Sequence, residues 1–347
     1  MPDSGQTEGR KVDHIRIVLG EDVAAKGIAT GFAAYRLPHT ALPELDLAQI
    51  DTRTTFLGKM IQAPLLISSM TGGANVAERL NLALAEAAEH LGLPMGVGSQ
   101  RAAVLDARLA STYQVRRVAP RIPLLANLGA VQLNYGFGID HCQRAVDMIE
   151  ADALILHLNP LQEAVQPEGD TNFAGLLGKI EQVCRALEVP VVVKEVGNGI
   201  GAHDARRLAE CGVQVIDVAG AGGTSWSEVE RFRQPTEQGR RVAGAFADWG
   251  LATTECIRQV RAALPEVGLI ASGGIRSGVD VAKAIALGAD LAGTARPALV
   301  SAVDERGTEA VVEGLTSFMR ELRVAMFCAG CGDLKALRSV TLTELRG

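Results

Sequence analysis

Short apolar runs alternate with amphipathic stretches along most of the chain. Eight of these runs are candidate strands, at residues 64–69, 94–99, 123–128, 153–158, 190–196, 213–218, 267–272 and 289–294. Each is apolar almost throughout, as are strands that are buried on both faces of a parallel sheet. Several begin at or directly after a proline, which the first position of a strand tolerates. The pattern therefore predicts eight buried parallel strands.

The stretches between these runs carry the spacing of helices. Residues 75–91 place apolar side chains on one helical face, at Val76, Leu80, Leu84, Ala87, Ala88 and Leu91. Residues 204–211, 253–264 and 279–287 repeat this spacing. Eight strands that alternate with helices predict an α/β fold, a (β/α)8 TIM barrel, and an open doubly wound sheet is the alternative.

Two segments depart from the even spacing. Residues 1–60 precede the first strand and are expected to form an N-terminal arm or cap, with residues 61–347 as a single catalytic barrel domain. The connection after strand six, about residues 220–251, is far longer than the roughly two to six residues usual in such folds. Long loops at the C-terminal face of a barrel build active sites. We therefore expect the active site at that face.

Composition excludes several classes of protein. The chain has 347 residues, of which 48% are hydrophobic and 21% charged, so a large core can be buried. Its formal net charge of −6 argues against a nucleic-acid-binding surface. No apolar run reaches the roughly 18 residues of a membrane span, and the polar N-terminus lacks the apolar core of a signal peptide. A cytoplasmic protein is expected.

Six cysteines, most of them in apolar, helix-like stretches, are typical of reduced thiols in such a protein. Cys328 and Cys331 form a CxxC pair. No second pair of ligands accompanies them, as a structural zinc site would require. We interpret them as structural or incidental thiols, with a metal or redox role as the alternative.

Two glycine-rich strand ends predict a phosphate site. Strand seven is followed by Gly273 and Gly274 before a helix, and strand eight ends at Ala295-Arg296. Glycines let the backbone approach an anion closely, and a helix start supplies free N–H groups. Barrels frequently bind phosphate after strands seven and eight. The alternative is that these glycines only turn the chain.

Polar residues also follow strands four and five. Lys194 ends an apolar run and is expected to point into the barrel mouth, where it could neutralise electron density on a flavin ring; the alternative is an exposed loop lysine. Period-two alternation places His157 and Asn159 on one face, and Gln162 and Glu163 follow them. Packing alone explains such a cluster poorly. Glu163 is the best candidate for a Mg²⁺ ligand, because Mg²⁺ is often held by one carboxylate and substrate phosphates.

Weaker signals lie elsewhere. The ends of strands one, two and three carry small or polar groups, and Thr224 follows strand six. In the arm, Arg10 and His14 would share one helical face beside Lys11. These three residues would suit a diphosphate, although the residues alone slightly favour a solvated basic tail.

Taken together, these motifs resemble the type 2 isopentenyl-diphosphate isomerases, which are FMN-dependent barrel enzymes. The matching pieces run in order through nearly the whole chain: Arg10-Lys11 with His14, Ser69-Met70-Thr71-Gly72-Gly73, Gly98-Ser99-Gln100-Arg101, His157-Leu158-Asn159 with Gln162-Glu163, Val193-Lys194-Glu195, Gly222-Gly223-Thr224 and Gly273-Gly274-Ile275-Arg276. One departure is Val12, where a more polar residue is expected. The basic residues around it are intact.

The resemblance implies interconversion of isopentenyl diphosphate and dimethylallyl diphosphate. It implies FMN binding by Met70, Thr71, Gly72, Ser99, Asn127, Lys194, Thr224, Gly274, Arg276, Ala295 and Arg296. It implies substrate binding by Arg10, Lys11, His14, Ser99, Arg101, His157, Asn159 and Gln162, with Mg²⁺ on Glu163. NADPH would serve only to reduce the flavin, because the reaction has no net redox change. A homo-oligomer, a tetramer or octamer, is also expected.

The chemistry requires addition of a proton to an unactivated alkene carbon and removal of another proton from a neighbouring carbon. Side-chain acid–base catalysis contributes about 10²–10⁴-fold, which is too little for this carbon acid. We therefore hypothesise that the reduced flavin is the main acid–base group. Gln162 and His157 are the candidate catalytic side chains, and Gln162 would orient the substrate or relay a proton.

Three other functions are weighed against this one. A 2-hydroxy-acid oxidase, the main alternative, needs a histidine base near an arginine in the loops after strands six or seven, and no histidine follows His203. An IMP-type dehydrogenase needs a nucleophilic cysteine in a glycine-rich loop, whereas Cys211 and Cys256 lie in helical patterns. A non-catalytic flavin-binding protein leaves the polar cluster after strand four unexplained.

Overall fold

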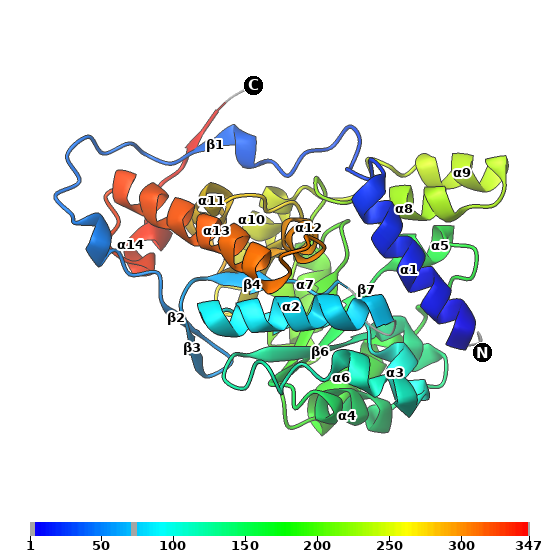
Figure 1. Cartoon of the computed structure of the whole chain (residues 1–347). Helices are drawn as coiled ribbons and strands as arrows, with labels where there is room; N and C mark the ends of the chain where they lie inside the picture. Colours follow the sequence, from blue (N-terminus) through cyan, green and yellow to red (C-terminus); the bar gives the residue numbers. More distant parts are fainter. Residues whose placement is uncertain (1–3, 71–74, 346–347) are drawn as a thin grey trace.

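The computed structural model describes residues 4–70 and 75–345 (Figure 1). Eight strands form a closed barrel in the order β10-β11-β4-β5-β6-β7-β8-β9. Their bounds are β4 (Leu65–Ile67), β5 (Met95–Gly96), β6 (Leu124–Gly129), β7 (Ala153–Leu158), β8 (Val191–Glu195), β9 (Val215–Asp217), β10 (Gly268–Ser272) and β11 (Leu291–Thr294). Pairing of β11 with β4 closes the ring. The predicted TIM barrel is confirmed, and the open sheet is excluded.

Helices surround the barrel as the periodicity predicts. They are α2 (Asn75–Leu91), α3 (Arg101–Leu105), α4 (Ile139–Met148), α5 (Pro160–Val165), α6 (Leu176–Ala186), α7 (Ala202–Glu210), α10 (Thr253–Ala263), α11 (Gly278–Ala286), α12 (Arg296–Ala302), α13 (Thr308–Cys328) and α14 (Leu334–Arg338). Short 3-10 turns lie at η1 (Phe32–Ala34), η2 (Leu47–Gln49), η3 (Ala107–Tyr113) and η4 (Ala130–Asn134). Among the described residues, no helix is long and apolar enough to cross a membrane.

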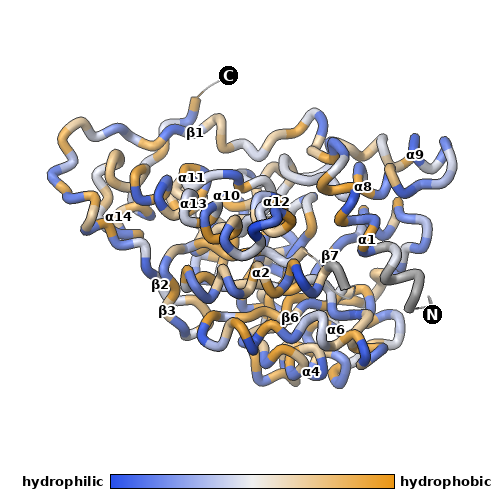
Figure 2. Tube along the Cα trace, in the orientation of Figure 1, coloured by the Kyte–Doolittle hydropathy of each residue, from blue (hydrophilic) through white to orange (hydrophobic). Residues whose placement is uncertain are grey.

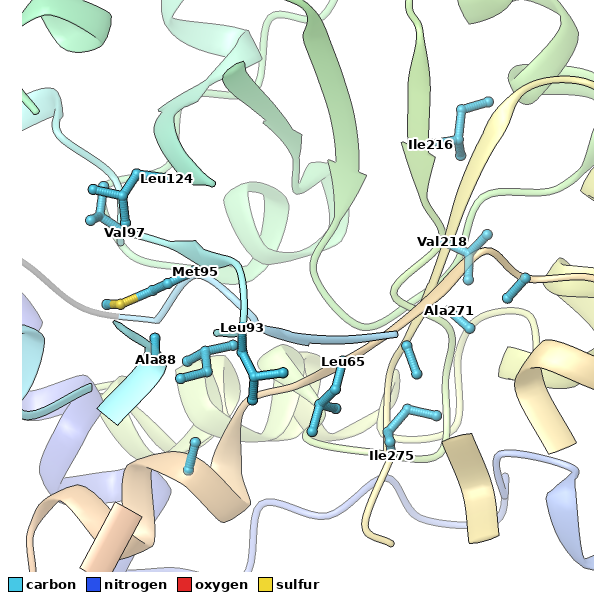
Figure 3. Packing of buried hydrophobic residues seen from close by; sticks show 14 of the residues in the cluster. Leu65, Ala88, Leu93, Met95, Val97, Leu124, Ile216, Val218, Ala271 and Ile275 are labelled. Carbon is cyan, nitrogen blue, oxygen red and sulfur yellow. The ribbon is translucent and has the colours of Figure 1, made fainter. Parts of the chain in front are cut away.

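Strand residues alternate between two apolar cores because successive side chains of a strand point to opposite faces. Leu125, Ile155 and Ile270 belong to a small cluster inside the barrel. Leu124 directly precedes Leu125, and Ala271 directly follows Ile270. Both belong to the larger cluster between strands and helices (Figure 3). Figure 2 shows the apolar residues gathered along the central strands. Inward-pointing positions can thus be assigned by parity alone.

A hairpin closes the N-terminal end of the barrel. Strands β2 (Thr54–Phe56) and β3 (Lys59–Ile61) pair antiparallel and lead directly into β4. Their residues Phe56 and Ile61 pack into the cluster inside the barrel. The interior is therefore sealed with apolar groups at this end, and polar groups are left for the opposite end. The division into an arm and a barrel at residue 60 stays a prediction.

The N-terminal segment packs along the barrel mouth. Helix α1 (Ser4–Gly20) contacts α3 and α8, and its Ile17 and Val18 are buried in the larger core. Beyond it, Ala24 forms an antiparallel bridge with Thr224. Farther on, β1 (Tyr35–Arg36) pairs with β12 (Thr343–Glu344) near the other end of the chain.

The long connection after β9 is helical rather than irregular. It contains α8 (Trp226–Arg233) and α9 (Glu237–Gly244). The Ser225 side chain caps α8 by accepting from the Glu228 N–H, and the Thr236 side chain caps α9 by accepting from the Gly239 N–H. Each cap satisfies an N–H group that a helix start leaves open. The two helices place side chains beside α1 and α5, at the edge of the barrel mouth.

Candidate active site

A cavity of about 480 Å³ lies at the C-terminal ends of the barrel strands. The predicted site residues that line it are Lys11, His14, Met70, Ser99, Arg101, Asn127, His157, Asn159, Gln162, Glu163, Lys194, Thr224, Gly274, Arg276, Ala295 and Arg296. Thr71 and Gly72 lie outside the described residues, as does the side chain of Arg10. The structure thus brings the other predicted residues together in one cavity.

A ring of polar side chains lies directly above the apolar interior of the barrel. Asn127, His157, Lys194, Asp217 and Ser272 each follow, two residues later, a side chain of the cluster inside the barrel. Because parity is preserved, all five point inward. The barrel therefore changes from apolar to polar within one layer, and four of these five side chains, all but Asp217, line the floor of the cavity.

The tautomer of His157 is fixed by its neighbour Asn127. The Nδ2 of Asn127 donates to the Val97 carbonyl over 3.1 Å, so the Oδ1 atom faces His157 Nδ1 at 2.8 Å. The backbone N–H of Asn127 donates to Gln100 Oε1 over 2.9 Å and holds the strand end in place. An amide oxygen can only accept, so Nδ1 of the histidine carries a proton. His157 is thereby oriented with Nε2 directed away from Asn127.

Lys194 is buried at the cavity floor, which contradicts the alternative of an exposed loop lysine. Its Nζ donates to the Glu195 carbonyl over 2.8 Å and lies 3.5 Å from Asp217 Oδ2. Ser272 Oγ donates to the other oxygen of Asp217 over 2.5 Å. Sequence reasoning missed Asp217 and Ser272. A signal was present, because Asp217 is the one charged residue in the apolar run 213–218 and shares the parity of Val215.

The glycine-rich ends of β10 and β11 form a backbone-lined wall of the cavity. Gly273 and Gly274 have φ of +99° and +75°, which side chains disfavour. A Cβ on Gly274 would also clash with the methyl group of Thr30. Arg276 donates to the Gly222 carbonyl over 3.1 Å, and Arg296 donates to the Val18 carbonyl over 3.1 Å. These backbone bonds anchor each arginine beside the cavity. Since a guanidinium has five N–H donors, one such bond does not exhaust its capacity to donate.

The opposite wall, across the barrel from β11, is backed by a wholly buried carboxylate, Glu230 of α8, which is not among the described residues that line the cavity. Its Oε1 atom is 2.9 Å from His14 Nε2 and accepts from Gln162 Nε2 over 3.0 Å. Its Oε2 atom accepts from Arg233 over 2.6 Å. Burial by itself would raise the pKa of Glu230, but the hydrogen bond and charge of His14, with Arg233 and Gln162, outweigh it and lower the pKa. His14 also meets the Trp226 ring edge-on at 5.1 Å between centroids.

Glu163 is nearly buried and its carboxylate is held by several donors. Asn159 Nδ2 donates to Oε1 over 2.9 Å, and the Asp170 N–H donates to Oε2 over 2.7 Å. Gln166 Nε2 also donates to Oε2. Within the described residues, no group of three or more His, Cys, Asp or Glu side chains is placed to hold a metal ion. A Mg²⁺ site here would rest on one carboxylate and ligand phosphates.

Two basic groups project from the arm and strand two toward the cavity. Lys11 Nζ donates to the Ser99 carbonyl over 2.9 Å and to Tyr113 Oη over 2.5 Å. Burial raises the pKa of Tyr113, so its hydroxyl stays neutral. Arg101 is 2.8 Å from Asp170 Oδ2. His14 contacts Glu230, and Lys11 contacts Ser99 and Tyr113. The alternative of a solvated basic tail is therefore wrong for Lys11 and His14.

Sequence reasoning also missed Glu230, Arg233 and Tyr113. Glu230 lies in the charge-rich stretch 228–233, whose pattern is typical of a solvated helix face. Tyr113 is in a 3-10 turn with no periodicity. The cysteines Cys328 and Cys331 are free thiols and do not line the cavity. They carry no role in this site.

Comparisons with known proteins show the family of the chain. The chain matches the profile of the family described as FMN-dependent dehydrogenase over residues 6–117 and 159–344. It is 58% identical to the isopentenyl-diphosphate delta-isomerase of Synechocystis sp., covering 97% of this chain and 96% of that protein. It is 55% identical to the protein of that name from Nostoc sp., covering 97% and 95%. The Oceanobacillus iheyensis protein of that name is 46% identical, with 97% and 96% covered.

Solved structures show the same fold. A mandelate oxidase mutant with an FMN adduct aligns with a TM-score of 0.66 at 21% identity, covering 98% of this chain and 99% of that one. A putative lactate oxidase of Pediococcus acidilactici aligns with a TM-score of 0.69 at 17% identity, covering 99% and 94%. At these identities the likeness concerns the fold alone.

Proposed function

The chain belongs to the isopentenyl-diphosphate delta-isomerases, within the FMN-dependent dehydrogenase family, and we propose that it interconverts isopentenyl diphosphate and dimethylallyl diphosphate. One observation carries the proposal beyond the family name. A single cavity has a glycine-rich wall suited to a phosphate and, opposite it, a wall of basic and amide side chains suited to a second anion. An isomerase that holds both a flavin phosphate and a substrate diphosphate needs both walls.

The residues present fit FMN. The hydroxyls of Ser68 and Ser69 line the cavity and are buried without a hydrogen-bond partner among the described residues, so a polar ring edge would satisfy them. Gly274, Arg276, Ala295 and Arg296 would hold the phosphate. The other proposed contacts are Met70, Thr71, Gly72, Ser99, Asn127, Lys194 and Thr224. Bound reduced FMN supplies an electron-rich ring able to give and take a proton.

The substrate would lie on the opposite wall. Arg10, Lys11, His14, Ser99 and Arg101 would hold the diphosphate, and release of Arg101 from Asp170 would free its guanidinium for this role. Glu163 would hold Mg²⁺ against the diphosphate. The buried oxygen Asn159 Oδ1 has no hydrogen-bond partner within the described part of the chain, which leaves an acceptor for a bound ligand.

Gln162 and His157 are the proposed catalytic side chains. Gln162 donates to Glu230, and its Oε1 accepts from Asn159 Nδ2 over 3.1 Å, so both ends of the amide are fixed. Gln162 does not titrate, so its role is to orient the substrate. The Glu230 carboxylate beside it accepts the hydrogen bond that Gln162 donates. His157, fixed by Asn127, would present Nε2 to the substrate.

Three finer points complete the proposal. NADPH would serve only as the reductant that brings the flavin to its active form. A cytoplasmic location is supported by six free thiols, which a reducing compartment preserves. A homo-oligomer, a tetramer or octamer, is supported by exposed apolar side chains on α9 and the segment after it, among them Val242 and Trp249.

The test is to incubate purified protein with isopentenyl diphosphate, reduced FMN and Mg²⁺ and to identify the product by NMR. Dimethylallyl diphosphate should form, and it should not form with oxidised FMN or with a chelator present. A parallel arm offers 2-hydroxy acids under oxygen. Consumption of a hydroxy acid without isomerisation would overturn the proposal in favour of an oxidase.

A further inference from the structure

Asp217 is a buried carboxylate that the proposed catalytic and binding residues do not include. It is 1% exposed and does not line the cavity among the described residues, whereas its two partners, Lys194 and Ser272, do. Asp217 is the parallel-register partner of Lys194 on the neighbouring strand. It therefore lies beside Lys194 in the polar layer and contacts two cavity-lining side chains without lining the cavity itself.

The contacts of Asp217 indicate that its negative charge compensates the positive charge of Lys194. Its Oδ2 atom lies 3.5 Å from the Lys194 ammonium, and its Oδ1 atom accepts from Ser272 over 2.5 Å. A buried carboxylate is costly unless it is paired and hydrogen-bonded, and here both conditions hold. In a buried site, screening by water is weak, so the carboxylate also offsets part of the field of Lys194 at the cavity.

We propose that Asp217 is a positioning residue that sets the redox potential of the bound flavin. It holds the Lys194 ammonium at the cavity floor and offsets part of its charge. Reduction of a flavin adds negative charge to the ring, so a less compensated Lys194 would favour the reduced form. The inference rests on FMN binding in the proposed function, but not on isomerisation.

The experiment measures the midpoint potential of the two-electron FMN couple in the holoenzyme, by equilibration with reference dyes. Asp217→Asn removes the carboxylate charge and keeps its size. It should favour binding of reduced over oxidised FMN by about tenfold, which is about 30 mV upward for a two-electron couple. Ser272→Ala removes a contact to Asp217 but no charge, so its preference for reduced over oxidised FMN should stay within about threefold of wild type, which is about 14 mV. An Asp217→Asn potential equal to that of Ser272→Ala would overturn the proposal.

A second pair of variants protects the test from misfolding of Asp217→Asn. Lys194→Gln should lower the potential, because the ring loses its cation and keeps the buried carboxylate. The double variant Lys194→Gln/Asp217→Asn leaves no unpaired buried charge and should recover part of that fall. A double variant identical to Lys194→Gln would show that Asp217 contributes nothing.

The potential also separates this inference from the proposed function. A protein that binds FMN and shows the expected shifts, yet does not isomerise isopentenyl diphosphate, would retain the role of Asp217 and lose the proposed activity. An active isomerase with unchanged potentials would retain the proposed activity and lose the role of Asp217.

Discussion

The two walls of the cavity are built differently. The wall after β10 and β11 consists of backbone from contiguous segments, with Gly273 and Gly274 in conformations that side chains disfavour. The opposite wall consists of side chains from distant segments: His14, Gln162 and Glu230 meet although His14 and Glu230 are 216 residues apart. A backbone wall is suited to a resident phosphate group. A wall of side chains can exchange partners when a substrate arrives.

The first prediction addresses the side-chain wall. Glu230→Gln leaves the half-buried Arg233 and His14 without their shared carboxylate, and breaking such a buried pair costs about 3–5 kcal/mol. Its unfolding temperature at pH 7 should fall well below that of wild type. Arg207→Gln, which changes an exposed ion pair, is the control and should change little.

The pH dependence of Glu230→Gln sharpens the same point. The folded-state pKa of Glu230 is lowered from 4.5, so its carboxylate contributes stability above that value and loses it as the pH falls through the folded pKa. The stability gap between wild type and Glu230→Gln should therefore be widest near pH 7 and narrow below about pH 4.5. A gap that widens at acid pH would contradict the assignment.

The second prediction separates metal from flavin. Glu163→Gln should reduce Mg²⁺-dependent turnover by at least about a hundredfold, because a metal supplies several kcal/mol of charge stabilisation. The protein should stay yellow, since Glu163 lies on the wall opposite the phosphate site. Glu168→Gln changes an exposed carboxylate just after α5 and is the control. Unchanged turnover in Glu163→Gln would refute the metal assignment.

The third prediction tests the backbone wall. Gly274→Ala should weaken FMN binding by about five- to a hundredfold, because strain at positive φ costs about 1–3 kcal/mol and its Cβ clashes with Thr30. Gly136→Ala is the control. Gly136 has a φ of +90° and open space around it, so this variant has the backbone strain but does not alter the phosphate site. Flavin fluorescence titration gives both dissociation constants. Equal affinities in the two variants would argue against a backbone grip.

The smallest effect is expected at Tyr113. Tyr113→Phe removes the hydroxyl that bridges Lys11 and the Ser99 carbonyl, a contact worth about 1 kcal/mol. The KM for isopentenyl diphosphate should rise about fivefold with kcat nearly unchanged. FMN affinity should not change. A fall in kcat alone would mean that Lys11 does more than bind.

The sequence predicted what local patterns determine. All eight strands follow from apolar runs, the shared face of His157 and Asn159 follows from period-two alternation, and the position of Lys194 follows from its place at the end of a run. Gly274 follows from a glycine run before a helix. Where α8 and α9 lie, the sequence predicts only a long connection, because these charge-rich segments lack a clear apolar stripe.

What the sequence could not predict depends on long-range packing. Glu230 is buried because α1 and α5 cover α8, and its neighbours in sequence are charged residues that suggest solvent. The contact of Lys11 with Tyr113 joins two segments 102 residues apart. Asp217 is different, because one charge in an apolar run with inward parity is a signal that can be read from the sequence.

One measurement tests most directly whether the two walls are separate anion sites in one cavity. Inorganic pyrophosphate with Mg²⁺ would be titrated calorimetrically into the FMN-loaded protein, while flavin absorbance in the filtrate reports released FMN. The two-wall account predicts one pyrophosphate bound per chain with FMN fully retained, and weaker binding in Glu163→Gln. Release of one FMN for each pyrophosphate bound would mean a single anion site and would contradict it.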